Sequence, residues 1–136
     1  MSGIVLDASV LIKLYINEEG SRRAASAVKK AETLIAPDLL WSEVGNILWK
    51  YVRRDALDAD TGEAILQDML QMPIVAMSSS DLLPQAFEIA TKYDRTVYDS
   101  LYLAAAVRAG VVMLTADERL AKALAGSPMD PFVRGL

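Results

Sequence analysis

The sequence predicts an α/β fold in which helices cover both faces of a parallel β-sheet. Short apolar runs alternate along the chain with longer stretches of helical periodicity, and this alternation is typical of a parallel sheet. Of the 136 residues, 53% are hydrophobic and 24% are charged, so the chain has ample material for one core. We see no internal repeat, linker or low-complexity tract. We therefore expect a single domain over residues 1–136.

The first part of the chain contains two predicted strands and two predicted helices. The apolar run Ile4-Val5-Leu6 predicts a strand over residues 3–6, which leads into a helix through Tyr15. Residues 20–31 have the pattern of a second helix, and residues 33–36 that of the next strand.

The middle of the chain continues the same alternation. Pro37-Asp38 opens a long helix that extends to about Arg54. A further helix spans roughly residues 59–71, and a strand follows at residues 73–76. The serines of residues 78–80 then cap a helix that ends near Tyr93.

The last part of the chain completes the predicted sheet. Residues 96–109 are predicted to be helical, residues 111–114 form an apolar strand, and residues 117–125 form the last helix. Residues 131–133 predict an additional strand at the edge of the sheet.

From the composition we expect a cytoplasmic protein. The chain has no cysteine, which excludes disulfides and thiol catalysis and fits a reducing compartment. Met1-Ser2-Gly3 does not begin a signal peptide. The longest apolar segment, residues 101–107, is too short to cross a bilayer, so we expect no membrane association.

The net charge of −4 weakens the case for a nucleic-acid partner but does not exclude one. Without the four acids Asp7, Glu43, Asp99 and Asp117, 14 acidic residues balance 14 basic residues. Bound divalent cations would reverse the sign of the charge around those four acids and attract phosphate.

Four carboxylates, which we call the acidic quartet, are predicted to meet at one edge of the sheet: Asp7, Glu43, Asp99 and Asp117. Asp7 ends the first apolar run, and Asp117 follows the run at residues 111–114. Residues just past the carboxyl ends of parallel strands converge on one crevice. Clustered carboxylates repel one another unless they share protons or bind a cation. Because the chain has no His and no Cys, an all-oxygen site suits Mg²⁺ or Mn²⁺ better than zinc.

Three of these acids also have a purely structural interpretation. Asp7 can cap the helix that follows it, because Asp is a favoured N-cap residue. Asp117 can do the same, although Thr115 and Glu118 form a capping box that leaves Asp117 unused. Glu43 would usually be a surface residue, but it borders the apolar stripe of its helix.

Asp99 is the acid that a structural interpretation explains least well. It is the only charged residue in residues 97–107, a helix that is apolar nearly all round and is predicted to be buried. A lone buried carboxylate needs a partner or a metal, although the helix dipole offsets part of that cost in the first turn. Asp99 is therefore the strongest single signal of a functional site.

Four blocks of sequence around the acidic quartet resemble the signature blocks of PIN-domain ribonucleases, and in particular of VapC toxins from VapBC toxin–antitoxin modules. They are IVLDASVLIK (residues 4–13), PDLLWSEV (37–44), YDSLYLA (98–104) and LTADERL (114–120). Their order and spacing match, so the resemblance covers essentially the whole chain. It implies a three-layer αβα sandwich with a central parallel sheet, Mg²⁺- or Mn²⁺-dependent endonuclease activity on RNA, and inhibition by a cognate antitoxin.

Carried over position by position, the resemblance makes the acidic quartet the catalytic and metal-binding residues. It makes Ser9 and Thr115 hydroxyl residues that support the site by hydrogen bonding. None of the four acids is substituted. In this chemistry divalent metal activates water for in-line attack on a phosphodiester and neutralises the transition state. The individual roles of the four acids and the number of ions stay open.

The resemblance also implies partners. It indicates structured tRNA or rRNA as the substrate, a homodimer, and antitoxin docking near Trp49, which lies opposite the apolar stripe of its helix. On the next helix, Leu57, Leu66, Met69 and Met72 either extend this apolar surface or pack in the core, which is the commoner position of Leu and Met. The candidate phosphate contacts are Lys13, Arg22, Arg23, Lys50, Arg53, Arg54 and Arg95.

Two other functions stay open at this point. One is an RNA-processing PIN nuclease without an antitoxin, which the absence of a small upstream gene for a DNA-binding antitoxin would favour. The other is a non-catalytic interaction module. Magnesium-dependent RNA cleavage that Asp99→Asn abolishes would exclude that module.

Overall fold

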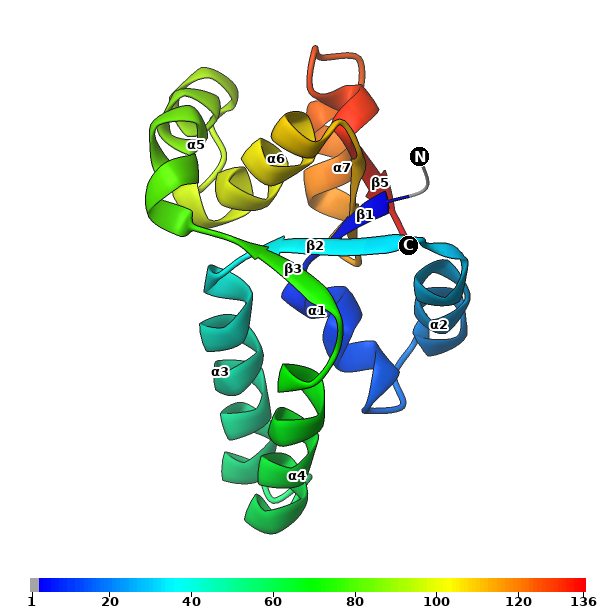
Figure 1. Cartoon of the computed structure of the whole chain (residues 1–136). Helices are drawn as coiled ribbons and strands as arrows, with labels where there is room; N and C mark the ends of the chain where they lie inside the picture. Colours follow the sequence, from blue (N-terminus) through cyan, green and yellow to red (C-terminus); the bar gives the residue numbers. More distant parts are fainter. Residues whose placement is uncertain (1–2) are drawn as a thin grey trace.

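The computed structural model describes residues 3–136, and within them five parallel strands form one sheet in the order β3-β2-β1-β4-β5 (Figure 1). The strands are β1 (Gly3–Leu6), β2 (Thr33–Pro37), β3 (Ile74–Met77), β4 (Val112–Thr115) and β5 (Val133–Gly135). The central strand β1 is buried along its whole length, as its uninterrupted apolar sequence predicts. Met1 and Ser2, on which the expectation of no signal peptide partly rests, lie outside the described residues.

Helices cover both faces of the sheet. The α-helices are α1 (Ala8–Leu11), α2 (Ser21–Lys30), α3 (Leu39–Arg53), α4 (Ala59–Leu70), α5 (Ser79–Tyr93), α6 (Val97–Ala109) and α7 (Glu118–Leu124), and the 3₁₀ helices are η1 (Ile12–Leu14) and η2 (Asp130–Phe132). Figure 1 shows α5, α6 and α7 on one face and α1 and α2 on the other, with α3 and α4 extending away from the sheet as a hairpin. This arrangement confirms the predicted α/β sandwich of three layers.

The two faces of β1 bury different side chains. Val5 packs in the cluster that contains the buried residues of α6, whereas Ile4 and Leu6 pack in a second cluster with Ala24 of α2. This division follows from the two-residue period of a strand, in which neighbouring side chains point to opposite faces. The central strand is therefore held from both sides, and the residue that follows it has a well-defined position.

Helix α6 is the buried helix that the sequence predicts. Its residues from Ser100 to Ala106 are buried, and it packs against β1, β2, β4 and α5. Burying a Leu side chain such as Leu103 stabilises the fold by about 1.5–3 kcal/mol. This packing fixes the amino-terminal turn of α6 at the carboxyl edge of the sheet, where the acidic quartet was expected.

The last predicted strand is shifted along the chain. We expected a strand at residues 131–133, but η2 occupies Asp130–Phe132 and the strand that pairs with β4 is Val133–Gly135. Pro131 lacks the backbone N–H that a strand residue donates, which explains the later start. Within residues 3–136, no helix is long and apolar enough to cross a membrane.

Candidate active site

Asp7 lies directly after the central strand and is held by hydroxyl groups from two elements. It is the N-cap of α1 and accepts the Val10 backbone N–H at 3.2 Å. The hydroxyl of Ser9 donates to Asp7 Oδ1, and the hydroxyl of Thr115 at the end of β4 donates to Oδ2 at 2.5 Å. Both expected hydroxyl residues therefore contact Asp7.

Burial raises the pKa of Asp7 from 3.8 to about 6. Desolvation of the carboxylate is the largest cause, and it outweighs the hydrogen bonds from Ser9, Thr115 and the backbone, which lower the pKa. The charged form of this carboxylate is therefore unfavourable unless it binds a proton or a cation.

The same two hydroxyls tie β1 to the turn that carries Asp117. Ser9 Oγ accepts the Ala116 backbone N–H at 3.0 Å, and Thr115 Oγ1 accepts the Asp117 backbone N–H at 3.0 Å. Each hydroxyl donates to Asp7 and accepts from this turn. The relative position of Asp7 and Asp117 is thus set by a short network of hydrogen bonds.

The expected capping box at residues 115–118 is wrong. Asp117 is itself the N-cap of α7, and its Oδ1 accepts the backbone N–H groups of Arg119 at 3.0 Å and Leu120 at 3.4 Å. Thr115 does not cap the helix, because its hydroxyl oxygen accepts the backbone N–H of Asp117 and not that of Glu118. Both capping bonds of Asp117 use one carboxylate oxygen.

Asp99 lies in the first turn of α6, which Thr96 caps by accepting the Asp99 backbone N–H at 3.1 Å. The side chain is only partly buried, so its desolvation costs less than the buried helix led us to expect. Its pKa is raised, first by desolvation and then by the negative charge of Asp117. Thr96 and the nearby positive charge of Arg95 oppose this rise.

Glu43, on α3, meets a residue that the sequence analysis missed. Tyr102 of α6 donates its hydroxyl hydrogen to Glu43 Oε1 at 2.5 Å, although the tyrosine is only 2% exposed. Its pKa is raised, first by burial, then by the hydrogen bond and charge of Glu43, and also by the charge of Asp7. The signal for this residue is its spacing, since Tyr102 lies three residues after Asp99 and so on the same helical face.

The acidic quartet is thus gathered at one edge of the sheet in two coupled parts. The charges of Glu43 and Asp7 both act on Tyr102, and the charge of Asp117 acts on Asp99. Within residues 3–136, however, no three acidic side chains lie close enough to form a ready-made ion site. The donor set nonetheless fits Mg²⁺ or Mn²⁺, because it consists of carboxylate oxygens, which these ions prefer as ligands.

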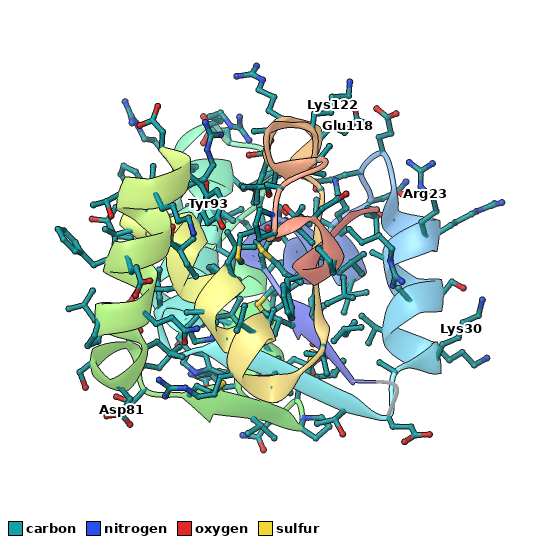
Figure 2. All side chains as sticks on the ribbon, turned by 90° about the horizontal axis from the view of Figure 1, so that it is seen from above. Arg23, Lys30, Asp81, Tyr93, Glu118 and Lys122 are labelled. Atoms are coloured by element: carbon teal, nitrogen blue, oxygen red, sulfur yellow. The ribbon has the colours of Figure 1, made fainter. Side chains whose placement is uncertain are left out.

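A cleft of about 660 Å³ opens beside Asp117, between α2 and α7. Figure 2 shows Arg23 of α2 and Glu118 of α7 on the same side of the molecule. Lys13 and Arg23 line this cleft, as does Arg119, which we did not predict as a phosphate contact. The remaining lining residues are Glu19, Gly20, Ala116, Glu118 and Leu136.

The predicted apolar surface on α3 and α4 is smaller than expected. Trp49 is 53% exposed, as predicted, and Arg53 lies over its ring at 5.4 Å. Met69 is fully buried, so core packing explains this residue, while Leu70 beside it is exposed. The large apolar residues exposed on this hairpin are therefore Trp49 and Leu70.

The fold and the site together define an α/β domain with acidic side chains collected at the carboxyl edge of a parallel sheet. The chain belongs to the PIN-domain family, whose profile matches residues 4–125. This match confirms the resemblance found in the sequence. The match includes the whole acidic quartet.

Similar proteins align with this chain over most of its length and of their own. Ribonuclease VapC3 of Pyrobaculum aerophilum is 38% identical over 121 residues, which are 88% of this chain and 92% of that protein. A crystal structure from the same organism has a TM-score of 0.71 at 26% identity and covers 92% of this chain and 81% of that one. A chain of a toxin–antitoxin complex from Klebsiella pneumoniae has a TM-score of 0.69 at 18% identity, with 96% and 95% coverage, and shares the fold.

The raised pKa of Asp7 predicts how stability depends on pH in metal-free buffer. Because the folded protein binds the Asp7 proton more tightly than the unfolded chain, the free energy of unfolding should fall as pH rises from about 4 to above 6. The full effect of this shift is about 3 kcal/mol. Denaturant unfolding between pH 4 and pH 8 in EDTA should show a steeper decline for wild type than for Asp7→Asn. Equal pH slopes in the two proteins would contradict the assignment.

Proposed function

We propose that this chain is a divalent-metal-dependent endoribonuclease and the toxin of a toxin–antitoxin pair. The observation that carries this proposal is the gathering of the acidic quartet at the carboxyl ends of β1 and β4 and on the helices beside them. The name of the Pyrobaculum aerophilum relative, a ribonuclease, supports RNA as the substrate. The cytoplasm, where RNA is abundant, is the proposed location.

Oxygen donors favour Mg²⁺ or Mn²⁺ as the cofactor. Such an ion, when bound, supplies a Lewis acid that activates water and neutralises charge on a phosphodiester. We propose all four members of the acidic quartet as the residues that hold it. Glu43 and Asp117 each have one oxygen engaged by a donor of the protein, so each keeps a second oxygen for this purpose.

The chain's own groups divide the remaining work. Ser9 and Thr115 hold Asp7 in one orientation, so this carboxylate enters the reaction with little freedom to lose. Glu43 is the member of the quartet with the longest side chain, and its free oxygen can accept a proton from attacking water. Asp99 and Asp117 concentrate negative charge where a cation is needed.

Replacing Asp99 should separate catalysis from folding. We expect Asp99→Asn to lower RNA cleavage by more than the roughly 100-fold that loss of a supporting residue costs at a metal site. The variant should melt at the same or a higher temperature than wild type in EDTA, because one repelling charge is gone. Mg²⁺ should raise the melting temperature of wild type much more than that of the variant.

Asp81→Asn is the matched control for this experiment. Asp81 also lies in the first turn of a helix, α5, but is exposed and far from Arg23 and Glu118 (Figure 2). It should cleave RNA like wild type. If Mg²⁺ stabilises wild type and Asp99→Asn equally, Asp99 does not hold the cofactor.

The cleft beside Asp117 is the proposed path of the RNA backbone. Arg23 and Arg119 line it, and no ion pair engages either of them among residues 3–136. Lys13 also lines it, but pairs with Glu18 at 3.1 Å. A strand whose phosphate reaches the acidic quartet can therefore contact Arg23 and Arg119 next.

Reversing the charge of Arg23 tests this path. In the inactive Asp99→Asn background, Arg23→Glu should weaken RNA binding and reduce the slope of log affinity against log salt by about 1. Lys30→Glu is the control, because Lys30 lies at the other end of the same helix (Figure 2). Fluorescence anisotropy at several salt concentrations measures both. Equal slopes for the two variants would exclude Arg23 from the path.

We propose a structured RNA, tRNA or rRNA, as the substrate. Large exposed aromatic residues in the described part of the chain are Trp49, Phe87 and Tyr98, and they lie on three different helices. They form no continuous stacking platform for a single strand. Recognition by shape, with a few basic residues that position one exposed loop, suits this surface better.

The RNA ends produced in cells test the substrate. Sequencing of 5′ ends after expression of wild type should give cuts concentrated in one tRNA or rRNA loop, and Asp99→Asn should remove them. Cuts scattered over many messenger RNAs would contradict recognition by shape.

The proposed protein partners are a second copy of this chain and an antitoxin. The Klebsiella pneumoniae complex, which contains a toxin and an antitoxin, supports an antitoxin partner by analogy of fold. Trp49 and Leu70, exposed on the α3–α4 hairpin, are the proposed apolar contacts. An RNA-processing nuclease without an antitoxin is the second candidate, since the acidic quartet would serve either role.

A further inference from the structure

Tyr102 occupies an unusual position for a residue of a buried helix. Its ring is enclosed in the core, at 2% exposure, yet its hydroxyl reaches the edge of the sheet and donates to Glu43 Oε1 at 2.5 Å. Tyr98, one turn earlier on α6, is 62% exposed. The two tyrosines therefore share a helix but have opposite surroundings.

The Glu43 carboxylate has two possible partners, the hydroxyl of Tyr102 and the ammonium group of Lys50. A shallow hollow of about 290 Å³ lies beside Glu43 on α3 and is lined by Asn46, Ile47 and Lys50, among others. Lys50 lies two turns after Glu43 on the same helix. A carboxylate on a flexible side chain can turn toward that ammonium group. The bond to Tyr102 instead keeps Glu43 on the side of α6, where Asp7 also acts on the tyrosine.

We infer that Tyr102 is a positioning residue, which holds Glu43 toward Asp7 by occupying one carboxylate oxygen and leaving the other free for the cation or for attacking water. The inference rests on the proposed nuclease function. It assigns no contact between Tyr102 and RNA. A rigid donor suits this role, because the packing of the ring on α6 fixes where the hydroxyl lies.

Four variants test the inference: Tyr102→Phe, Tyr98→Phe, Glu43→Gln and the double variant Tyr102→Phe/Glu43→Gln. Tyr102→Phe removes one oxygen and keeps the ring that fills the core. We expect it to weaken Mn²⁺ binding about 10-fold, within the range for a residue that orients a metal ligand. Electron paramagnetic resonance titration of Mn²⁺ without RNA measures this directly.

The kinetic effect should follow the metal affinity and not substrate binding. At a limiting Mn²⁺ concentration, Tyr102→Phe should lower kcat on an RNA hairpin by a similar factor and leave KM unchanged. Tyr98→Phe, the matched control on the same helix, should behave like wild type in both measurements. In the Glu43→Gln background, adding Tyr102→Phe should change Mn²⁺ affinity by less than about twofold, because the residues act as one unit.

Glu43→Asp provides an independent test that leaves the core untouched. The shorter side chain keeps the charge but brings the carboxylate back from the Tyr102 hydroxyl, so Mn²⁺ binding should weaken as in Tyr102→Phe. The inference is overturned if either variant binds Mn²⁺ like wild type. It is also overturned if Tyr102→Phe has its full effect in the Glu43→Gln background.

The wild-type protein separates this inference from the proposed function. If wild type binds Mn²⁺ but cleaves no RNA, the proposed nuclease function fails, and the Mn²⁺ affinities alone decide the role of Tyr102. If wild type binds no Mn²⁺, both fail together.

Discussion

The hydrogen bond from Thr115 to Asp7 joins the carboxyl ends of the two neighbouring strands β1 and β4, and the rest of the site depends on it. It places a carboxylate at the centre of the sheet edge and holds it against the turn that leads to Asp117. The cost is electrostatic, since burial raises the pKa of Asp7 to about 6. Because the fold fixes Asp7 beside the turn that carries Asp117, we expect the two carboxylates to act together.

Helix α6 supplies two further residues of the site, Asp99 and Tyr102. Because its middle is packed on all sides by the sheet and α5, its first turns cannot move away from the sheet edge. Asp99 and Tyr102, three residues apart, are therefore held close to the other acids of the quartet. Glu43 arrives from α3, and its contact with Tyr102 ties this separate helix to the core. The buried apolar part of α6 thus fixes the positions of the Asp99 carboxylate and the Tyr102 hydroxyl.

Local patterns explain which features of this fold could be predicted from the sequence. Apolar runs such as Ile4-Val5-Leu6 specify their own strand, and the nearly uniform apolar surface of α6 specifies burial. Residues whose role depends on a distant partner were harder to predict. Local spacing alone makes Thr115 a capping residue, because its partner Asp7 lies 108 residues earlier in the chain. Only the resemblance to PIN-domain ribonucleases indicated its role in the site. The spacing of Tyr102 from Asp99 indicates a shared helical face, but nothing in the local sequence indicates that Glu43 is the acceptor of its hydrogen bond.

Which residues lie at the surface could also be predicted only where a local pattern indicates it. Trp49 was placed outside the core correctly, because it lies opposite the apolar stripe of its own helix. Met69 and Leu70 are neighbours in sequence with opposite burial, and only the packing of α4 against α3 decides which of them faces the core. Arg119 could not be connected with Arg23, because the cleft that they share is formed by two helices far apart in the chain.

In the proposed function, four carboxylates from four separate elements serve one divalent-metal site. A crystal structure of the wild-type protein grown with Mn²⁺, with an anomalous difference map, tests it most directly. We expect an anomalous peak between Asp7 and Asp99, at about 2.0–2.3 Å from carboxylate oxygens, with Glu43 and Asp117 turned toward it. A peak away from these residues, or no peak at saturating Mn²⁺, would contradict the account.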